Sequence, residues 1–270
     1  MPLAVCATPI GNLQDVTLRV LDELRSADVL LCEDTRHTRV LLERHGIEQP
    51  RLLSYHEHNE AKRTREMLPR LQAGERVALV SDAGVPGISD PGARLVAAAL
   101  DAGVPVTVLP GASAVETALV ASGFPVERYQ FLGFLPRGEK ALAALWDELA
   151  GWPHPAVAFE SPRRLPATLR SLASAQPERP VAVCRELTKR FEEVVRGPAA
   201  EVAAHFSEAP KGEITVVLGG VTGPTRAAGT DEAVAAVAEL VAAGVARRRA
   251  ADVVARLTGT PRNELYRRTL

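Results

Sequence analysis

The sequence predicts an α/β protein with two α/β domains and a small helical C-terminal extension. Short apolar runs alternate with amphipathic stretches in two successive series, as strands and helices do in βα units. Polar loops marked by glycine and proline follow the apolar runs, as expected where strands end and helices begin. We place the domains at residues 1–112 and 113–222, and the extension at residues 223–270.

The first series contains five expected strands, which predicts a mostly parallel sheet covered by helices on both faces. Asp15 is placed to cap the first helix, and Pro91 stands at the first turn of the fourth. The strands are expected at residues 3–7, 29–32, 51–54, 77–81 and 104–109, and the helices at residues 16–27, 35–45, 60–72 and 91–102.

The second series repeats this alternation after the punctuation Pro110-Gly111-Ala112-Ser113-Ala114. Its strands are expected at residues 129–132, 157–160, 181–185 and 214–219, and its helices at residues 114–122, 140–150, 165–175 and 199–206. A linker rich in Gly, Pro and Thr follows at residues 220–229, then helices at residues 231–243, 247–258 and 261–269. The last two, joined by Thr258-Gly259-Thr260, have the outline of a helix-turn-helix or of a helical hairpin that packs on a dimer partner.

Composition argues against a membrane protein and against a disulfide scaffold. The chain is 46% hydrophobic, but no apolar run reaches the roughly 18 residues that span a bilayer. The N-terminus lacks the basic and apolar regions of a signal peptide. Cys6, Cys32 and Cys184 are odd in number, far apart and outside any CxxC motif. A cytoplasmic location is the simplest expectation for such a chain.

Charge is distributed unevenly along the chain. Residues 245–270 hold seven arginines against Asp252 and Glu264, so this tail carries +5, whereas the preceding 244 residues carry −6. A basic tail on an acidic body is typical of a nucleic-acid contact surface. A helix with a solvated arginine face is the alternative.

Common catalytic motifs are missing from the sequence. It has no GxxxxGK[ST] loop, no GxGxxG after the first strand and no GxSxG elbow, so an ordinary nucleotide-binding unit or serine hydrolase is not indicated. His56-Glu57-His58-Asn59-Glu60 is not an HExxH motif, and we interpret it as a polar loop without a metal.

Polar loops end all five strands of the first series. They are Thr8-Pro9-Ile10-Gly11-Asn12-Leu13, Glu33-Asp34-Thr35-Arg36, Ser54-Tyr55-His56, the glycine-rich run at residues 80–92, and Pro110-Gly111-Ala112-Ser113. The carboxyl ends of parallel strands share one sheet edge, where ligands of open α/β sheets bind. We therefore expect one cleft lined by these loops, with the run at residues 80–92 as its main ligand loop.

The second series places cations beyond two of its strands. Arg163, Arg164, Arg185, Lys189 and Arg190 follow these apolar runs and would suit a substrate that bears phosphates. A surface of salt bridges, which carries little energy, is the alternative.

The order of the sequence motifs resembles the ribosomal RNA small-subunit methyltransferase I family, in the tetrapyrrole-methylase fold. The motifs are the polar loops described above, His56-Glu57-His58-Asn59-Glu60, Gly133-Phe134-Leu135-Pro136, Glu160-Ser161-Pro162 and Arg185-Glu186-Leu187-Thr188-Lys189. The resemblance covers nearly the whole chain. It implies two αβα domains, S-adenosylmethionine as methyl donor in an interdomain cleft, and a homodimer. The implied reaction is 2′-O-methylation of a cytidine in the decoding region of small-subunit ribosomal RNA.

The resemblance also assigns residues to the donor. The implied donor contacts are Pro9, Ser81, Asp82, Ala83, Gly84, Ile88, Gly111, Ala112, Ser113, Gly212, Glu213 and Ile214. Val85 stands where the family pattern has Thr, and Arg163 where it has His. The second departure argues against a histidine base at that position.

A ribose 2′-OH is a poor nucleophile, so a base or a nearby cation should assist the transfer. Asp34, Arg36 and Asp90 are the candidates on the shared edge, although Asp34 and Arg36 could instead form a structural ion pair. The expected RNA contacts are Arg163, Arg164, Lys189, Arg190, Arg247, Arg248, Arg249, Arg262, Arg267 and Arg268. Methylation of a small macrocycle and a non-catalytic RNA-binding module are the alternative functions.

Overall fold

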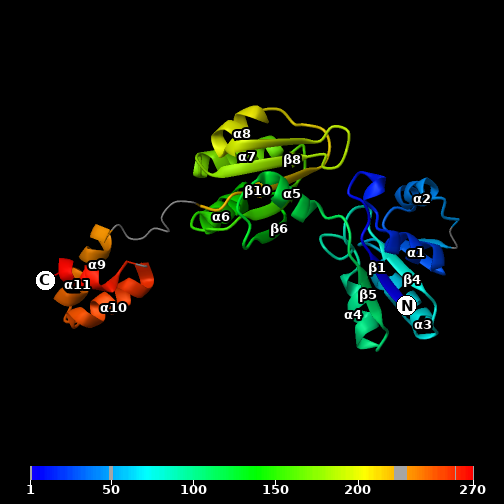
Figure 1. Ribbon diagram of the computed structural model, residues 1–270, viewed down its shortest axis with the longest axis horizontal. Coiled ribbons are helices and arrows are strands. Elements are labelled where there is room, and N and C mark those ends of the chain that lie inside the picture. Colours follow the sequence, from blue (N-terminus) through cyan, green and yellow to red (C-terminus); the bar gives the residue numbers. More distant parts are fainter. Residues whose placement is uncertain (1, 49–50, 222–229, 259, 270) are drawn as a thin grey trace.

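The computed structural model describes residues 2–48, 51–221, 230–258 and 260–269. Its first sheet is built from β1 (Leu3–Cys6), β2 (Val29–Cys32), β3 (Leu52–Ser54), β4 (Val77–Val80) and β5 (Val106–Leu109), in the order β3-β2-β4-β1-β5 (Figure 1). Every neighbouring pair is parallel. The five polar loops therefore leave the sheet at one edge, as the sequence predicts.

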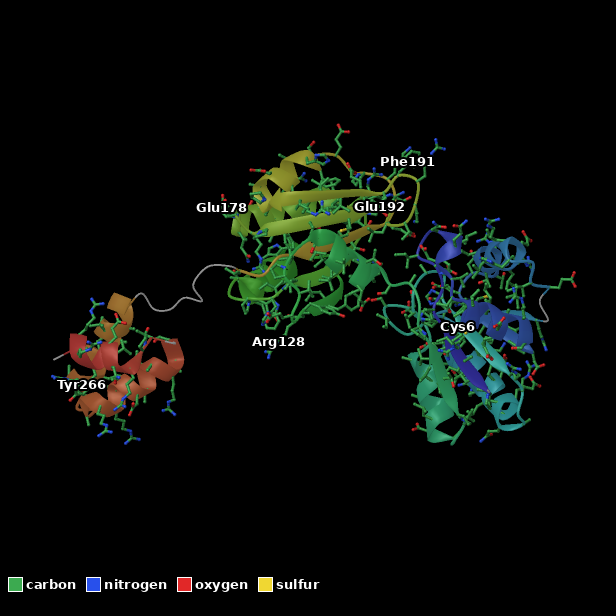
Figure 2. The ribbon with its side chains drawn as sticks, viewed as in Figure 1. Cys6, Arg128, Glu178, Phe191, Glu192 and Tyr266 are labelled. Carbon is green, nitrogen blue, oxygen red and sulfur yellow. The ribbon has the colours of Figure 1, made fainter. Side chains whose placement is uncertain are left out.

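Helices cover both faces of this sheet. Alternate strand residues point to opposite faces, so Ala4 and Cys6 pack with α1 (Leu18–Ser26) and α2 (Thr35–Arg44), while Leu3 and Val5 pack with α3 (Glu60–Gln72) and α4 (Ala93–Asp101). Cys6 lies inside this first domain (Figure 2). The central strands β1, β2 and β4 bury every side chain, which explains their continuous apolar sequences, whereas the edge strands β3 and β5 are only partly buried.

The second sheet is mixed. It contains β6 (Gln130–Phe134), β7 (Ala156–Glu160), β8 (Pro180–Arg185), β9 (Glu193–Pro198) and β10 (Ile214–Leu218), in the order β6-β7-β10-β8-β9. The β6–β7 pair is parallel and the other three pairs are antiparallel.

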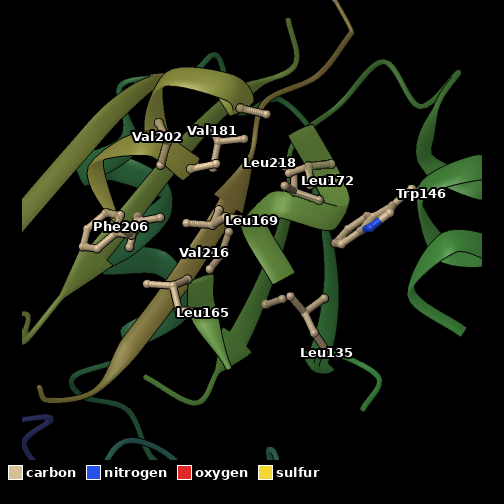
Figure 3. Packing of buried hydrophobic residues seen from close by; sticks show 14 of the residues in the cluster. Leu135, Trp146, Leu165, Leu169, Leu172, Val181, Val202, Phe206, Val216 and Leu218 are labelled. Atoms are coloured by element: carbon tan, nitrogen blue, oxygen red, sulfur yellow. The ribbon is translucent and has the colours of Figure 1, made fainter. Parts of the chain in front are cut away.

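Two apolar layers enclose the second sheet. One face packs against α6 (Glu139–Leu149), α7 (Leu165–Ala175) and α8 (Ala199–His205), around Trp146 and Phe206 (Figure 3). The other face packs against α5 (Ala114–Ser122), in a cluster that also contains Ile10 of the first domain. The second core therefore extends to the junction between the domains.

Three C-terminal helices pack on one another: α9 (Thr230–Ala242), α10 (Arg247–Thr258) and α11 (Arg262–Arg268) (Figure 1). Val237, Ala250, Val254 and Leu265 form their own small core. The helices confirm the predicted extension. Among the described residues, no helix is both long and apolar enough to cross a membrane.

Two predicted helix starts are wrong. Asp15 does not cap α1, because it belongs to a short 3₁₀ helix, η1 (Leu13–Asp15); the Thr17 hydroxyl accepts the capping bond from the Val20 amide at 3.2 Å. Pro91 precedes α4, which begins at Ala93 after Gly92, whose φ of +147° only glycine adopts easily. In both cases the helix begins later than predicted, because a turn at the carboxyl-terminal edge of the sheet precedes it.

Sequence reasoning missed one strand, β9. The sequence analysis predicts no strand there, because only two adjacent apolar residues, Val194 and Val195, mark it. An edge strand with one partner needs few apolar residues, and Pro198 ends it without a lost ladder bond. The expected linker at residues 220–229 falls largely on residues 222–229. Residues 222–229 lie outside the described residues, and so does the predicted domain boundary after residue 222. Gly259, in the predicted turn of the helix-turn-helix, also lies outside them.

Candidate active site

A cavity of about 420 Å³ lies between the two sheets and takes its walls from both domains. The first domain and the start of α5 supply Ile10, Asp82, Ala83, Gly84, Val85, Ile88, Ser89, Asp90, Ser113, Ala114 and Val115. The second domain supplies Phe134, Phe159, Glu160, Ser161, Pro162, Cys184, Leu187, Gly212, Glu213, Ile214 and Thr215. The interdomain cleft is therefore present, and the loop after β4 forms one side of it.

The loop after β4 is held rigidly against the loop after β1. Thr8 and Gly84 exchange two backbone hydrogen bonds, with N–O distances of 2.8 and 3.0 Å, and the Thr8 hydroxyl donates to the Ser81 carbonyl at 3.0 Å. Gly84 has a φ of +76°, so the absence of a side chain lets the backbone turn there. These contacts present Asp82, Ala83 and Gly84 to the cavity.

Three carboxyl groups gather on this edge. The Asp82 carboxylate accepts a hydrogen bond from the Asp34 amide at 3.0 Å, which ties the loops after β2 and β4 together. Burial, followed by the nearby carboxylates of Glu33 and Asp82, raises the pKa of Asp90 to about 6. Burial and Asp82 also raise the pKa of Glu33. Asp90 lines the cavity, so a group able to exchange a proton near neutral pH faces it.

Asp34 and Arg36 are placed differently, outside the cavity wall. The Arg36 Nη2 lies 2.8 Å from Asp34 Oδ2, and Arg36 Nε donates to Asp34 Oδ1 at 3.1 Å. These bonds from Arg36 lower the pKa of Asp34 to about 2. Asp34 and Arg36 therefore form the ion pair that the sequence analysis gave as the alternative. The Asp34 carboxylate is a weak base.

Glu160 closes the opposite wall and is fully buried. Its carboxylate accepts hydrogen bonds from Arg164 at 2.9 Å, from the Thr168 hydroxyl at 2.6 Å and from the Ser161 amide at 2.6 Å. Arg164 also donates to the carbonyls of Leu135 and Pro136. These hydrogen bonds compensate for the burial of the Glu160 carboxylate. Because Arg164 donates to these interior groups, its guanidinium is not available for a phosphate.

The remaining cations expected to contact RNA are distributed over two surfaces. Arg163 and Arg190 are exposed, and the Arg190 guanidinium lies 5.5 Å from the ring centre of Phe191, an exposed side chain (Figure 2). Lys189 is bound to Glu186 and Glu213. Arg248, Arg249, Arg267 and Arg268 are exposed on the C-terminal helices, whereas Arg247 and Arg262 are half-buried and Arg262 pairs with Asp252.

The structure brings eight of the twelve expected donor contacts to the cavity wall: Asp82, Ala83, Gly84, Ile88, Ser113, Gly212, Glu213 and Ile214. Ser81 lies buried beneath the loop, where its hydroxyl donates to the carbonyls of Ala83 and Gly84. Gly111 approaches Ala7 so closely that a Cβ would lie 2.9 Å from that side chain. Ser81 and Gly111 therefore shape the wall, and Pro9 and Ala112 also lie outside the cavity lining.

Sequence reasoning gave no role to Phe134, Phe159 and Leu187, which line the cavity together with Ile10, a residue of one of the predicted cleft loops. Phe159 ends an apolar run that is typical of a buried strand, and Leu187 is the one apolar residue of the charged segment 185–190. The Phe134 side chain is 62% exposed. The polar motif of residues 56–60 lies outside this wall, where the Asn59 amide group donates to the carbonyl of Ser54 at 3.2 Å.

Comparisons with known proteins agree with this arrangement. The family model of the Tetrapyrrole (Corrin/Porphyrin) Methylases matches residues 2–203. The "Ribosomal RNA small subunit methyltransferase I" of Synechocystis sp. is 42% identical over 99% of this chain and 97% of its own length. The protein of that name from Thermotoga maritima is 48% identical over 81% of this chain and 98% of its own length.

Solved structures share the fold at low sequence identity. The methyltransferase CobJ matches with a TM-score of 0.61 and 19% identity, over 81% of this chain and 94% of that one. Uroporphyrin-III C-methyl transferase from Thermus thermophilus, complexed with S-adenyl homocysteine, matches with a TM-score of 0.57 and 19% identity, over 80% of this chain and 96% of that one.

Proposed function

We propose that this chain, which belongs to the Tetrapyrrole (Corrin/Porphyrin) Methylase family, transfers a methyl group from S-adenosylmethionine to a ribose 2′-OH of small-subunit ribosomal RNA. The observation that carries the proposal is the 42% identity to the Synechocystis ribosomal RNA methyltransferase across nearly the full length of both chains. The finer part, a cytidine in the decoding region as acceptor, comes from the family resemblance.

The cavity suits such a donor. Its volume falls within the range of roughly 300–1,000 Å³ of small-molecule sites, and apolar side chains with a few polar groups line it. The left-handed backbone at Gly84 and Gly212, with φ of +76° and +100°, brings peptide groups to the surface without side chains in the way. Asp82 contributes negative charge to a site for a cationic ligand, and the Glu213 carboxylate in the opposite wall is paired with Lys189.

When bound, S-adenosylmethionine supplies a methyl group activated by its positive sulfur. The residues of the chain hold the donor and the ribose in line, which supplies much of the rate. We assign Asp90 as the general base, because it lines the cavity and its pKa of about 6 leaves it ionised at neutral pH while still able to accept a proton. Its carboxylate would take the proton of the 2′-OH.

The basic surfaces support the RNA part of the proposal. The exposed arginines of α10 and α11 would contact phosphates, and Arg163 and Arg190 would do so nearer the cavity. Arg36, with 85% of its side chain exposed, keeps guanidinium donors free for a phosphate beside its bonds to Asp34. An RNA substrate also agrees with the 2′-OH as acceptor.

A homodimer and a cytoplasmic location belong to the same proposal. Cys6, Cys32 and Cys184 are buried free thiols, and burial raises the pKa of Cys6 to about 12 and of Cys184 to about 11. Inert thiols of this kind suit a reducing compartment.

Mass spectrometry of small-subunit RNA from a strain that lacks the protein would test the proposal. We expect one ribose methyl to disappear, and to return with the wild-type chain but not with Asp90→Asn. Purified protein should methylate small-subunit particles and leave a corrinoid precursor unmodified. An unchanged RNA methylation pattern in the deletion strain would refute the RNA substrate, and methylation of the corrinoid alone would replace it with a macrocycle.

A further inference from the structure

A segment of the second domain reaches across the domain junction and touches the first domain. We call Glu186-Leu187-Thr188-Lys189, which follows β8, the interdomain strap. The Asn12 amide donates a hydrogen bond to the Thr188 hydroxyl oxygen at 3.0 Å, although 176 residues separate the two along the chain. The loops after β1 and after β8 are therefore joined directly.

The strap has an unusual backbone. Glu186 and Thr188 have φ of +52° and +66°, in the left-handed region that non-glycine residues rarely occupy and that is least favourable for a β-branched residue. Local bonds hold this conformation: the Glu186 amide donates to the Glu213 carbonyl at 3.0 Å, and the Glu213 amide donates to the Glu186 carboxylate at 2.9 Å. The surrounding structure thus imposes the shape of the strap.

Lys189 fixes the other end of the strap. Its ammonium group lies 3.0 Å from a Glu186 carboxylate oxygen and 2.7 Å from one of Glu213, so its stem cannot move freely. The stem lies against Gly11, where a Cβ would stand 2.5 Å from Lys189 Cγ and 2.8 Å from the Thr188 hydroxyl. Only glycine at position 11 allows the strap to dock this closely.

The docked strap also forms part of the cavity wall. Leu187, between the two left-handed residues, lines the cavity and packs in one apolar cluster with Ile10. Glu213, which binds both Glu186 and Lys189, lines it too. Docking of the strap on Gly11 and Asn12 therefore sets the distance between the two walls.

We propose that the interdomain strap closes the donor cavity and that Thr188 is a positioning residue for the donor, acting through its bond to Asn12. The inference rests on the proposed function, because it takes the cavity as the donor site. A ligand that contacts both walls binds best when the strap is docked, and by reciprocity it strengthens docking. If a substitution lowers the fraction of molecules with a docked strap, the apparent affinity for the donor falls by the same factor.

Titration calorimetry with S-adenosylhomocysteine tests the proposal without any RNA or turnover. Thr188→Val keeps the branched shape and removes the hydrogen-bond acceptor, while Gly11→Ala places a methyl group against Lys189. We expect affinity to fall about fivefold for Thr188→Val and about tenfold or more for Gly11→Ala, on the scale of one lost hydrogen bond and one displaced contact.

Two controls match these variants. Thr188→Ser keeps the hydroxyl and should bind within about twofold of wild type. Gly151→Ala adds a methyl group where no atom lies within 4 Å, and should do the same. Hydrogen exchange should show that the ligand protects residues 186–192 in the wild type and protects them less in Thr188→Val.

The outcomes separate the inference from the proposed function. If the wild type binds S-adenosylhomocysteine and both Thr188→Val and Gly11→Ala bind it equally well, the strap does not position the donor. If the wild type does not bind it, the proposed donor is wrong. Should Gly11→Ala fail to fold, the comparison of Thr188→Val with Thr188→Ser still decides.

Discussion

Asp34 and Arg36 form a two-point ion pair at the edge of the first sheet, with Oδ2–Nη2 and Oδ1–Nε distances of 2.8 and 3.1 Å. The Asp34 carboxylate also accepts a hydrogen bond from the Arg36 amide at the start of α2, so it caps that helix. A carboxylate held in this way is stabilised as an anion and is a poor proton acceptor. Asp90, in the cavity wall, has the opposite properties.

The two aspartates should therefore respond differently to removal of their charge. Asp90→Asn should lower the single-turnover rate of methyl transfer by about 10²–10⁴-fold, the usual contribution of a general base. Asp34→Asn should lower it less than about tenfold, because Asn can still accept the capping bond from the Arg36 amide and only the ion pair with Arg36 is lost. Quench-flow with labelled donor measures both rates, and a larger loss in Asp34→Asn than in Asp90→Asn would reverse our assignment.

The rate should depend on pH through the same group. Asp90 is active when deprotonated, and its pKa is raised to about 6, so the single-turnover rate should rise tenfold per pH unit below about 6 and level off above it. The Asp90→Asn variant should lack this step. A wild-type profile that stays flat between pH 5 and pH 8 would exclude Asp90 as the base.

Ionised Asp90 should also reduce stability. Its pKa is about 6 in the folded protein and about 3.9 in the unfolded chain, so the folded state binds the proton more tightly. Stability from this group is complete below about pH 4 and is lost as the pH rises to 6. Asp90→Asn should thus melt higher than the wild type at pH 7.5, with a smaller difference at pH 4.5. Thermal unfolding at both pH values measures this, and a lower melting temperature for Asp90→Asn at pH 7.5 would contradict it.

Much of the fold follows from local sequence signals. The expected ranges 29–32, 60–72 and 165–175 coincide with β2, α3 and α7, because each is an apolar or amphipathic run with sharp ends. The strand β9 was not predicted, because a strand at the edge of a sheet needs few apolar residues. Asp15 and Pro91 misled because each lies in a turn that precedes a helix, and no local signal separates a cap from such a turn.

The site was harder to predict for a physical reason. Polar loops at strand ends identified Asp82 and Gly84, but an apolar wall residue such as Phe159 ends a run that is typical of a buried core strand. The choice between Asp34 and Asp90 depends on burial and on neighbours distant in sequence, which only the folded chain defines.

Arg179 holds the second domain together from inside. It is 5% exposed, and it donates to the carbonyls of Gly219 at 2.6 Å and of Leu149, the last residue of α6, at 2.7 Å. Arg179→Met should lower the free energy of unfolding by about 2–4 kcal/mol, because it takes the guanidinium donor from the buried Gly219 carbonyl and leaves the Leu149 carbonyl with the Trp152 amide alone. Arg170→Met, at an exposed position of α7, should change it by less than about 0.5 kcal/mol. Chemical denaturation compares the two, and equal effects would show that the Arg179 bonds are dispensable.

The first turn of α10 breaks a rule of helix electrostatics. Arg247, Arg248 and Arg249 stand at its positive end, and no acidic residue accompanies them there. Cations cost helix stability at that position, so their presence favours a role in binding.

Neutralising the exposed arginines should therefore weaken RNA binding in a salt-dependent way. Combined replacement of Arg248, Arg249 and Arg267 by Gln should make the slope of log affinity against log salt less negative by about 2–3, since each phosphate contact contributes roughly 0.7–0.9. Affinity for S-adenosylhomocysteine should stay unchanged. The matched control replaces Arg19, Arg44 and Arg170, which are exposed on α1, α2 and α7, and it should leave the slope as in the wild type. Filter binding to small-subunit RNA between 50 and 200 mM salt, on the order of cellular ionic strength, gives these slopes. Equal slopes for the two triple variants would show that the C-terminal helices make no phosphate contacts, and their arginines would then be a solvated face.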